Sequence, residues 1–403
     1  MTTAAPVRPD PGHTISQRTH AALTHRATPL SAVVEDITDL HDELSVPLTA
    51  HARWLLARAQ ATRQPCTAVV VDDVLSGRVR AAALLTRSHR PFVPVAEIRL
   101  VGHGTSDELC LAAASGDAAE ALADGIVDLL DRERLWHLHL EQLPAGDPVL
   151  RALSARLPHT RVTAGDALPR TAWPAPRPER GWAARKIRNQ VRRAERAADE
   201  SGLPWSIDVI DDRDSVLAAL PETLEVRRAR ELDLSRVDGL ASADRAGAHV
   251  AAISSVAEHG QVELWRLRHA GELVAYLVAG HDHGWIRLLD SRIRPGSEAI
   301  SPGLILHGRA QVTWYADTKI VGVDFGRGAS TFKHKWCQAE HETSTLHAWS
   351  HQWLETVGSA ATSADLRARD ALRSARESSP IFARAVRAVR RAQTASASRP
   401  GHR

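Results

Sequence analysis

The chain has 403 residues, of which 43% are hydrophobic and 25% charged, and its formal net charge is +3. These proportions are typical of a soluble globular protein, and the length predicts two domains plus tails. No apolar run reaches the roughly 18 residues of a membrane-spanning helix, and the N-terminus lacks the basic-then-apolar order of a signal peptide. A cytoplasmic enzyme is therefore expected.

Cysteine and histidine usage gives no sign of a metal site. The cysteines, Cys66, Cys110 and Cys337, are widely spaced and odd in number, so neither a disulfide framework nor a metal cluster is predicted. The histidines are dispersed, and the one tight group, His281-Asp282-His283, is explained more simply by a hairpin turn. Arginine is plentiful and lysine scarce, a bias that weakens any argument from basic residues to nucleic acid.

The first part of the chain is predicted to be a tail followed by an α/β domain. Residues 1–30 have little apolar surface to bury and are expected to be disordered. Residues 31–167 show alternating strand and helix patterns. Strands are predicted at 66–71, 78–85, 96–101 and 136–140, and helices at 50–59 and 118–131.

A second domain is predicted at 181–357, after a proline-rich linker at 168–180. It begins with a basic helix at 185–196, followed by a strand at 205–210 and helices ending near Gly260. Three further strands, joined by short turns, predict an antiparallel meander. These strands cover 262–267, 272–279 and 285–290.

The meander leads into Ser301-Pro302-Gly303-Leu304. A serine before a proline and a helix-forming run is typical of a helix start, with the hydroxyl as cap and the proline at the first helical position. The free N–H groups and the helix dipole at such a start favour a pyrophosphate or another anion. The plainer alternative is a helix cap with no ligand.

A short apolar strand at 320–323 opens into Asp324-Phe325-Gly326-Arg327-Gly328, and Lys333 follows. Glycines on both sides of Arg327 let the backbone pass close to a ligand. Arginine and lysine beyond a strand end are suited to bind phosphate or carboxylate.

The two motifs, S-P-G-x-x-L and D-F-G-R-G-x-x-x-F-K-x-x-W, together resemble those of the CelD-like acyltransferases, a branch of the GNAT superfamily related to FemAB-type aminoacyl transferases. The resemblance runs from about residue 45 to about 350. It implies an α/β fold of tandem GNAT-like domains, each a mixed, mostly antiparallel sheet flanked by helices. The family usually has tyrosine where this chain has Phe332, which removes a possible proton donor.

The resemblance implies acyl transfer from acyl-CoA, with acetyl-CoA favoured, to an amine or less favourably a hydroxyl. The acceptor would be a small molecule, a peptide or an envelope precursor, attacked directly without a covalent enzyme intermediate. The acyl thioester would lie between the strands at 285–290 and 320–324. The expected donor-binding residues are Ser301, Pro302, Gly303, Leu304, Gly326 and Gly328.

Four charged residues are the catalytic candidates. Asp324 or Asp290 is the candidate base, although either could instead be a structural partner of an arginine, Arg327 or Arg292. Lys333 and Arg327 are expected to act electrostatically on the reacting group.

Several alternatives remain. The basic helix at 185–196 is a solvated face, a contact for CoA phosphates, or a binding surface for tRNA in a FemAB-like aminoacyl transferase. A non-catalytic binding protein that retains the fold is a third possibility. Residues 358–403 are predicted to be a basic helical tail, which either packs on the domain or lies on an anionic membrane surface.

Overall fold

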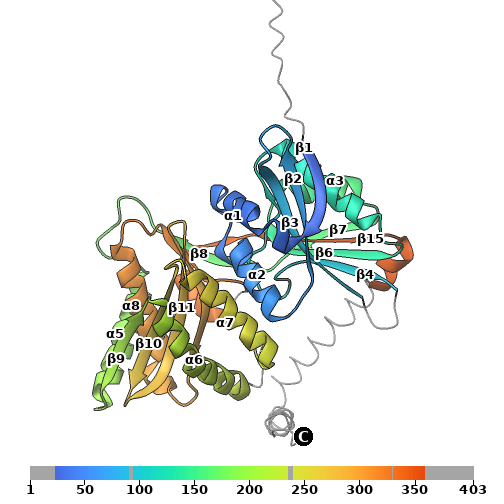
Figure 1. Ribbon diagram of the computed structural model, residues 1–403. Helices are drawn as coiled ribbons and strands as arrows, with labels where there is room; N and C mark the ends of the chain where they lie inside the picture. The colour runs from blue at the N-terminus through green and yellow to red at the C-terminus, as the bar shows by residue number, and fades with distance from the viewer. Residues whose placement is uncertain (1–22, 90–93, 235–238, 329, 359–403) are drawn as a thin grey trace, which may run out of the picture.

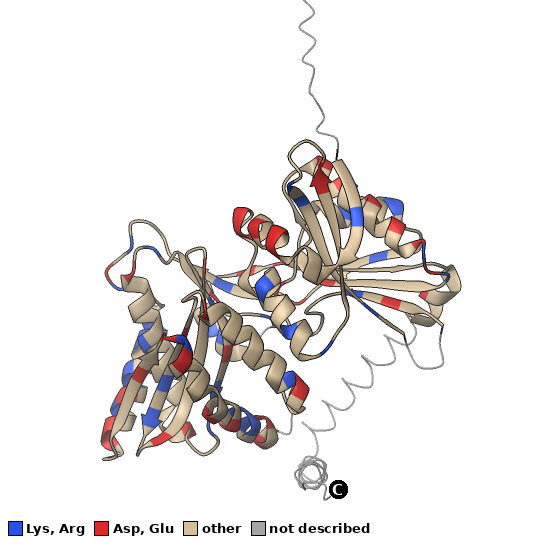
Figure 2. Ribbon diagram, in the orientation of Figure 1, with Lys and Arg blue, Asp and Glu red and all other residues tan. Residues whose placement is uncertain are grey.

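The structure is a computed structural model that describes residues 23–89, 94–234, 239–328 and 330–358. The described chain forms two mixed, mainly antiparallel sheets, each flanked by helices (Figure 1). Acidic and basic positions are interspersed over both halves (Figure 2), in agreement with the small net charge. Among the described residues, no helix is both long and apolar enough to cross a membrane.

The first sheet has eight strands in the order β1-β2-β3-β4-β6-β15-β7, with β5 paired to β3. Its strands are β1 (Leu23–Pro29), β2 (Cys66–Asp73), β3 (Val79–His89), β4 (Ala96–Leu100), β5 (Ala112–Ala113), β6 (Trp136–Pro144), β7 (Thr160–Ala164) and β15 (Thr343–Trp349). The accompanying helices are α1 (Val34–Glu43), α2 (Ala52–Ala61), α3 (Gly116–Leu130) and α4 (Pro148–Arg156).

The second sheet has seven strands in the order β14-β8-β13-β12-β11-β10-β9. Its strands are β8 (Leu168–Ala172), β9 (Trp205–Ile210), β10 (Val262–His269), β11 (Glu272–Asp282), β12 (Trp285–Ile293), β13 (Gly322–Asp324) and β14 (Ala339–His341). Its helices are α5 (Arg185–Glu200), α6 (Arg213–Asp233), α7 (Ala243–Ala257), α8 (Pro302–Ala316) and α9 (Thr331–Trp336).

The chain departs from the expected domain boundaries at three strands. β1 pairs along its whole length with β2, although residues 1–30 were expected to be a tail. β8 pairs with β13 and β14, so Leu168–Ala172 belongs to the second sheet and not to a linker. β15 lies between β6 and β7 of the first sheet, although it was assigned to the second domain. The tail expected at 358–403 lies, from residue 359 onward, outside the described residues.

Helices cover both faces of the second sheet (Figure 1). Successive residues of a strand point to opposite faces, so Leu277 packs into the core under α5 and α8, while Tyr276 packs into the core under α6 and α7. The core on the α6 and α7 side continues into the first half, where α2 packs against α7. The two halves therefore share one continuous apolar core.

The pairing between β12 and β13 is short, because β13 ends at Asp324. β12 and β13 run parallel for only three register pairs, the last being Arg287 with Asp324, while β12 continues to Ile293. The first sheet has a similar place, since the parallel register of β4 and β6 ends at Arg99 with His139. Beyond each of these pairs the two strands no longer share a register.

Candidate functional site

The N-terminus of α8 lies just beyond the end of β12. The helix begins at Pro302 as predicted, and Ser301 precedes it in the left-handed conformation with φ of 49°. The Ser301 hydroxyl makes no capping hydrogen bond to the helix, contrary to expectation. Because proline has no N–H, Gly303 carries the first amide donor, and none of the described hydrogen bonds uses it. This helix start therefore offers a donor to a ligand.

A groove of about 320 Å³ opens at this helix start. Arg193 of α5 and Lys335 of α9 supply its two positive charges, beside the positive end of the α8 dipole. The groove is lined by Gln190, Arg193, Ala194, Ala197, Ala299, Ser301, Leu304 and Lys335. Two cations and a helix N-terminus around one hollow favour an anionic ligand.

The Gly-Arg-Gly loop faces the first half of the chain instead of this groove. Arg327 Nε donates to Asp166 Oδ2 at 2.8 Å, and its Nη1 lies 3.3 Å from Glu141 Oε1. Gly326 has φ of 72°, and a Cβ built there would lie 2.7 Å from Asp107 Oδ2. The close backbone approach at Gly326 is thus to a carboxylate of the protein itself.

Lys333 of α9 also holds this loop. Its Nζ donates to the carbonyl oxygens of Gly326 at 3.1 Å and Arg327 at 2.7 Å. Burial lowers the pKa of Lys333, against the opposing charges of Asp107 and Asp324. In this structure the ammonium group fixes the turn after β13.

Asp324 sits in a buried ion cluster between the two halves. Its Oδ2 accepts from Arg170 Nε and from Arg287 Nη1, both at 2.8 Å, and its Oδ1 accepts from the Gly326 N–H. Arg170 and Arg287 also pair with Glu108, and Arg287 pairs with Asp282. Asp324 is therefore a partner of arginines, which was one of the two roles expected for it. Its partners are Arg170 and Arg287 and not Arg327.

Asp290 lies on the opposite face of the sheet from the groove, toward α6 and α7. Its carboxylate accepts from Tyr276 Oη and Arg227 Nη1, each at 2.7 Å, and from Arg292 Nη1 at 3.1 Å. Burial would raise the pKa of Asp290, but Arg292 and Arg227 lower it overall. Burial and the adjacent Asp290 charge raise the pKa of Tyr276 well above its usual range. Asp290 is thus an ionised acceptor and Tyr276 a protonated donor at neutral pH.

Aromatic side chains fill the space between β12, α8 and α9. The rings of His307 and Phe332 meet edge to face with centroids 4.9 Å apart, and Trp336 packs beside both. His307 Nε2 lies 3.1 Å from Ser291 Oγ, whereas the buried Nδ1 has no hydrogen-bond partner among the described residues. Burial lowers the pKa of His307 to about 3. Phe332, at the expected tyrosine position, is therefore part of an apolar cluster.

The structure divides the predicted site residues into three places. Ser301 and Leu304 line the groove, with Pro302 and Gly303 between them in the chain. Asp290 faces α6 and α7, and Asp324, Arg327 and Lys333 lie at the junction of the two halves. Sequence reasoning missed the partners that define these places, because they come from distant strands and helices. The missed residues are Glu108, Arg170, Arg227, Tyr276 as a partner of Asp290, Arg287 and Lys335, whereas Arg193 belongs to the basic helix expected as a contact for CoA phosphates.

Comparison with known proteins gives a family for part of the chain. Residues 185–334 match the family model described as an acetyltransferase (GNAT) domain. This segment runs from the start of α5 into α9, so it contains the lining residues of the groove except Lys335, the strands β12 and β13, and the Gly-Arg-Gly loop. No match was found among curated proteins.

Solved structures share the fold over most of the chain. A crystal structure of FemX has a TM-score of 0.59 at 10% identity, covering 82% of this chain and 99% of that one. The C-terminal domain of a putative lysylphosphatidylglycerol synthetase from Agrobacterium fabrum has a TM-score of 0.52 at 10% identity, covering 79% and 91%. A conserved protein of unknown function from Bacteroides thetaiotaomicron has 0.52 at 12%, covering 81% and 99%. The predicted α/β fold, with two mixed, mostly antiparallel sheets flanked by helices, is confirmed, and the second half contains the segment that matches the GNAT family model.

Proposed function

We propose that this protein is an acyltransferase whose acyl donor binds at the N-terminus of α8. The observation that carries the proposal is the groove beside Gly303, with Arg193 and Lys335 on its walls. Except for Lys335, its lining residues lie inside the segment that matches the acetyltransferase family. A bound anion there would be held by the free amide, the helix dipole and two cationic side chains.

An acyl-CoA, with acetyl-CoA favoured, is the donor that fits this arrangement. Its diphosphate would occupy the groove at Ser301 to Leu304, and the rest of the donor would extend between the diverging strands. The motif resemblance to CelD-like acyltransferases supports the same choice. In this proposal the loop after β13 forms the edge of the donor path that lies away from the groove. Its conformation is fixed by the contacts of Arg327 and Lys333, and it contains Gly326 and Gly328.

The acceptor would approach from the α6 and α7 side, where Asp290 and Tyr276 lie. An amine of a small molecule, peptide or envelope precursor would attack the thioester carbonyl and expel the thiolate. Asp290 is the proposed proton acceptor for the amine, and the Tyr276 phenol is the proposed proton donor on this face. Asp324 holds its two arginines and keeps the strand ends together, so we assign it a positioning role.

A second candidate is transfer of an aminoacyl group from tRNA. The fold likeness to FemX and to the domain of a putative lysylphosphatidylglycerol synthetase favours it, as does the basic stretch at the start of α5. In that case the tRNA phosphates would bind α5 with an affinity that falls as salt rises. A third possibility, a binding protein without catalysis, is opposed by the intact motifs Ser301-Pro302-Gly303 and Asp324 to Lys333.

The test is a calorimetric titration of the full chain with acetyl-CoA, longer acyl-CoAs and aminoacyl-tRNA. We expect binding of an acyl-CoA that is weakened by Arg193→Glu and by Lys335→Glu, since each replaces an attractive charge with a repulsive one. Arg196→Glu is the matched control, because this exposed residue on the same helix does not line the groove.

Equal weakening by all three variants would show a diffuse charge effect and contradict a site in the groove. No binding of any CoA, together with salt-dependent binding of tRNA, would favour the aminoacyl transferase. No binding of either donor would contradict both candidates.

A further inference from the structure

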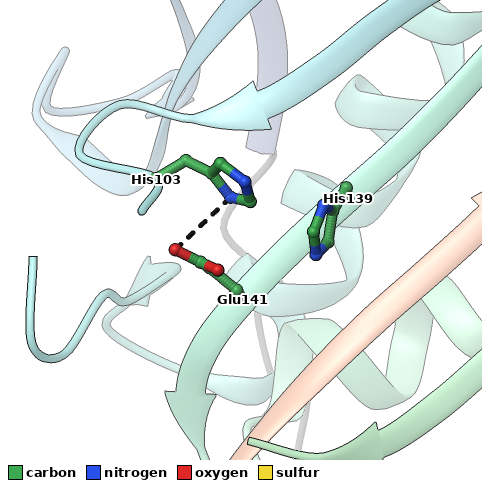
Figure 3. A group of neighbouring side chains, drawn as sticks. All are labelled: His103, His139 and Glu141. Atoms are coloured by element: carbon green, nitrogen blue, oxygen red, sulfur yellow. Dashed lines mark ion pairs between the residues drawn. The ribbon is translucent and has the colours of Figure 1, made fainter. Parts of the chain in front are cut away.

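We propose that His103, His139 and Glu141 form a binding site for a divalent transition-metal ion, with Zn²⁺ the best match. The site lies in the first half of the chain, outside the groove. Figure 3 shows the three side chains converging on one space. Each can supply a ligand atom, and these atoms all lie within 4.8 Å of one another.

Two neighbouring segments bring the three residues together. His139 and Glu141 are two apart on β6 and therefore point to the same face of the sheet. His103 comes from the turn that follows β4, between Gly102 and Gly104, whose φ angles are 91° and 72°. A Cβ at Gly102 would lie 2.6 Å from Ser106 Oγ, so the tight turn that places His103 requires glycine.

The three residues lie at the end of the β4–β6 pairing in the first sheet, which corresponds to the end of the β12–β13 pairing in the second sheet. The parallel register of β4 and β6 ends at Arg99 with His139, just as that of β12 and β13 ends at Arg287 with Asp324. The space beyond the second pair is the proposed path of the acyl donor. The space beyond the first pair contains the imidazoles and the carboxylate instead.

At least one nitrogen atom of the cluster is available to bind a metal ion. His103 Nδ1 is buried, lies 3.5 Å from Glu141 Oε1, and has no hydrogen-bond partner among the described residues. The His139 ring lies between those of His103 and His347, with centroid distances of 4.5 and 4.0 Å. Arg327 is the described cation at the Glu141 carboxylate, and the imidazoles stacked beside it supply nitrogen lone pairs that a metal ion can bind.

The donor set matches zinc better than magnesium or calcium. Two imidazole nitrogens and one carboxylate oxygen are common zinc ligands, whereas Mg²⁺ and Ca²⁺ prefer oxygen alone. Around zinc the ligand bonds are about 2.0–2.2 Å, so modest side-chain rotation would draw the three atoms together. Three protein ligands leave room for a water molecule or an acceptor group on the ion.

Arg327 couples this site to the Gly-Arg-Gly loop. Its Nη1 lies 3.3 Å from the same Glu141 oxygen that faces His103, so the guanidinium and a metal ion would compete for one carboxylate. Removing the guanidinium should therefore strengthen metal binding. A merely structural histidine cluster would not show this gain.

The experiment is equilibrium dialysis of the full chain against Zn²⁺ with elemental analysis, repeated with Co²⁺ to record its visible absorption. The wild type should hold one tight equivalent of zinc and show the absorption bands of coordinated Co²⁺. His139→Gln should weaken binding by more than the roughly 10–100-fold that loss of an outer-shell partner costs. Glu141→Gln keeps an acceptor for the Gly104 N–H and should weaken binding as well.

His281→Gln is the matched control, since His281 is a more exposed histidine near a carboxylate, Glu263, in the other sheet. Arg327→Ala should bind zinc more tightly than the wild type. The proposal is overturned if the wild type holds no tight equivalent, or if His139→Gln and Glu141→Gln, folded by circular dichroism, bind zinc as the wild type does.

Discussion

Arg287 donates a hydrogen bond from Nη1 to Asp324 Oδ2 at 2.8 Å, and these two residues are also the last register pair between β12 and β13. The contact therefore lies at the end of the paired part of the two strands. Arg287 reaches Glu108 of the first half with the same nitrogen, at 3.2 Å. One guanidinium thus ties the edge of the proposed donor path to both halves of the chain.

Replacing Arg287 should cost more stability than replacing an exposed arginine. In Arg287→Ala the buried carboxylates of Asp324, Glu108 and Asp282 lose a shared cation, and we expect a loss of about 3–5 kcal/mol in the free energy of unfolding. Arg213→Ala removes a more exposed guanidinium and should cost about 1 kcal/mol or less. Urea denaturation measures both, and equal losses would contradict the assigned role.

Gly326 and Gly328 should respond differently to the same substitution. Both have positive φ, so alanine costs about 1–2 kcal/mol at either position. Gly326→Ala should cost about 1–3 kcal/mol more, because its Cβ would overlap Asp107, whereas a Cβ at Gly328 meets nothing within 4 Å. Thermal unfolding of the two variants gives the comparison, and a Gly328→Ala loss as large as that of Gly326→Ala would refute the steric explanation.

Tyr276→Phe should cost stability without unfolding the protein. The substitution removes a hydrogen bond of 2.7 Å to the ionised Asp290, which keeps Arg227, Arg292 and the Ser291 N–H as donors. We expect a loss of about 1–2 kcal/mol in the free energy of unfolding. If Tyr276 is also the proton donor, kcat with an identified acceptor should fall by a larger factor than the affinity for that acceptor. A change in KM alone would assign the phenol to binding.

His307 should make the protein less stable in acid. Its pKa is lowered from 6.5 to about 3 by burial, so below pH 6.5 the unfolded chain takes up a proton that the folded chain does not. The stabilising contribution is complete above pH 6.5 and falls by about 1.4 kcal/mol per pH unit as the pH drops toward 3. His307→Gln should lack this part of the slope.

The measurement is denaturant unfolding of wild type and His307→Gln at several pH values. Residue 307 is uncharged in both proteins at about pH 8, so that comparison isolates the packing change. The gap between the two free energies should then shift in favour of the variant as the pH falls. A constant gap down to about pH 4.5 would mean that His307 takes up its proton in the folded state too.

Local signals in the sequence were enough for many elements. Pro302 marks the start of α8, and the turn at Asp282, His283 and Gly284 joins β11 to β12, because a positive φ favours such residues there. The nearly unbroken burial along β11 agrees with its apolar sequence and with its position between two helical layers. Each of these features depends on residues close together in the chain.

Features that depend on distant partners could not be predicted in the same way. Thr343–Trp349 has the pattern of a strand, but nothing nearby indicates that it pairs with β6 and β7 of the first sheet. The partners of Asp324 likewise come from β8 and β12, so the neighbouring Arg327 was the natural but wrong candidate. His103 and His139 meet only because β4 and β6 are parallel neighbours.

The most direct test of the central claim is amide hydrogen exchange of the full chain with and without acetyl-CoA. A donor at the groove should slow exchange in the first turn of α8, at Gly303 to Ile305, and in α5 around Arg193, while leaving β1 and β2 unchanged. That pattern would show that the acyl donor binds in the groove at the start of α8. Unchanged exchange at the start of α8 under saturating acetyl-CoA, or protection confined to the first sheet, would contradict it.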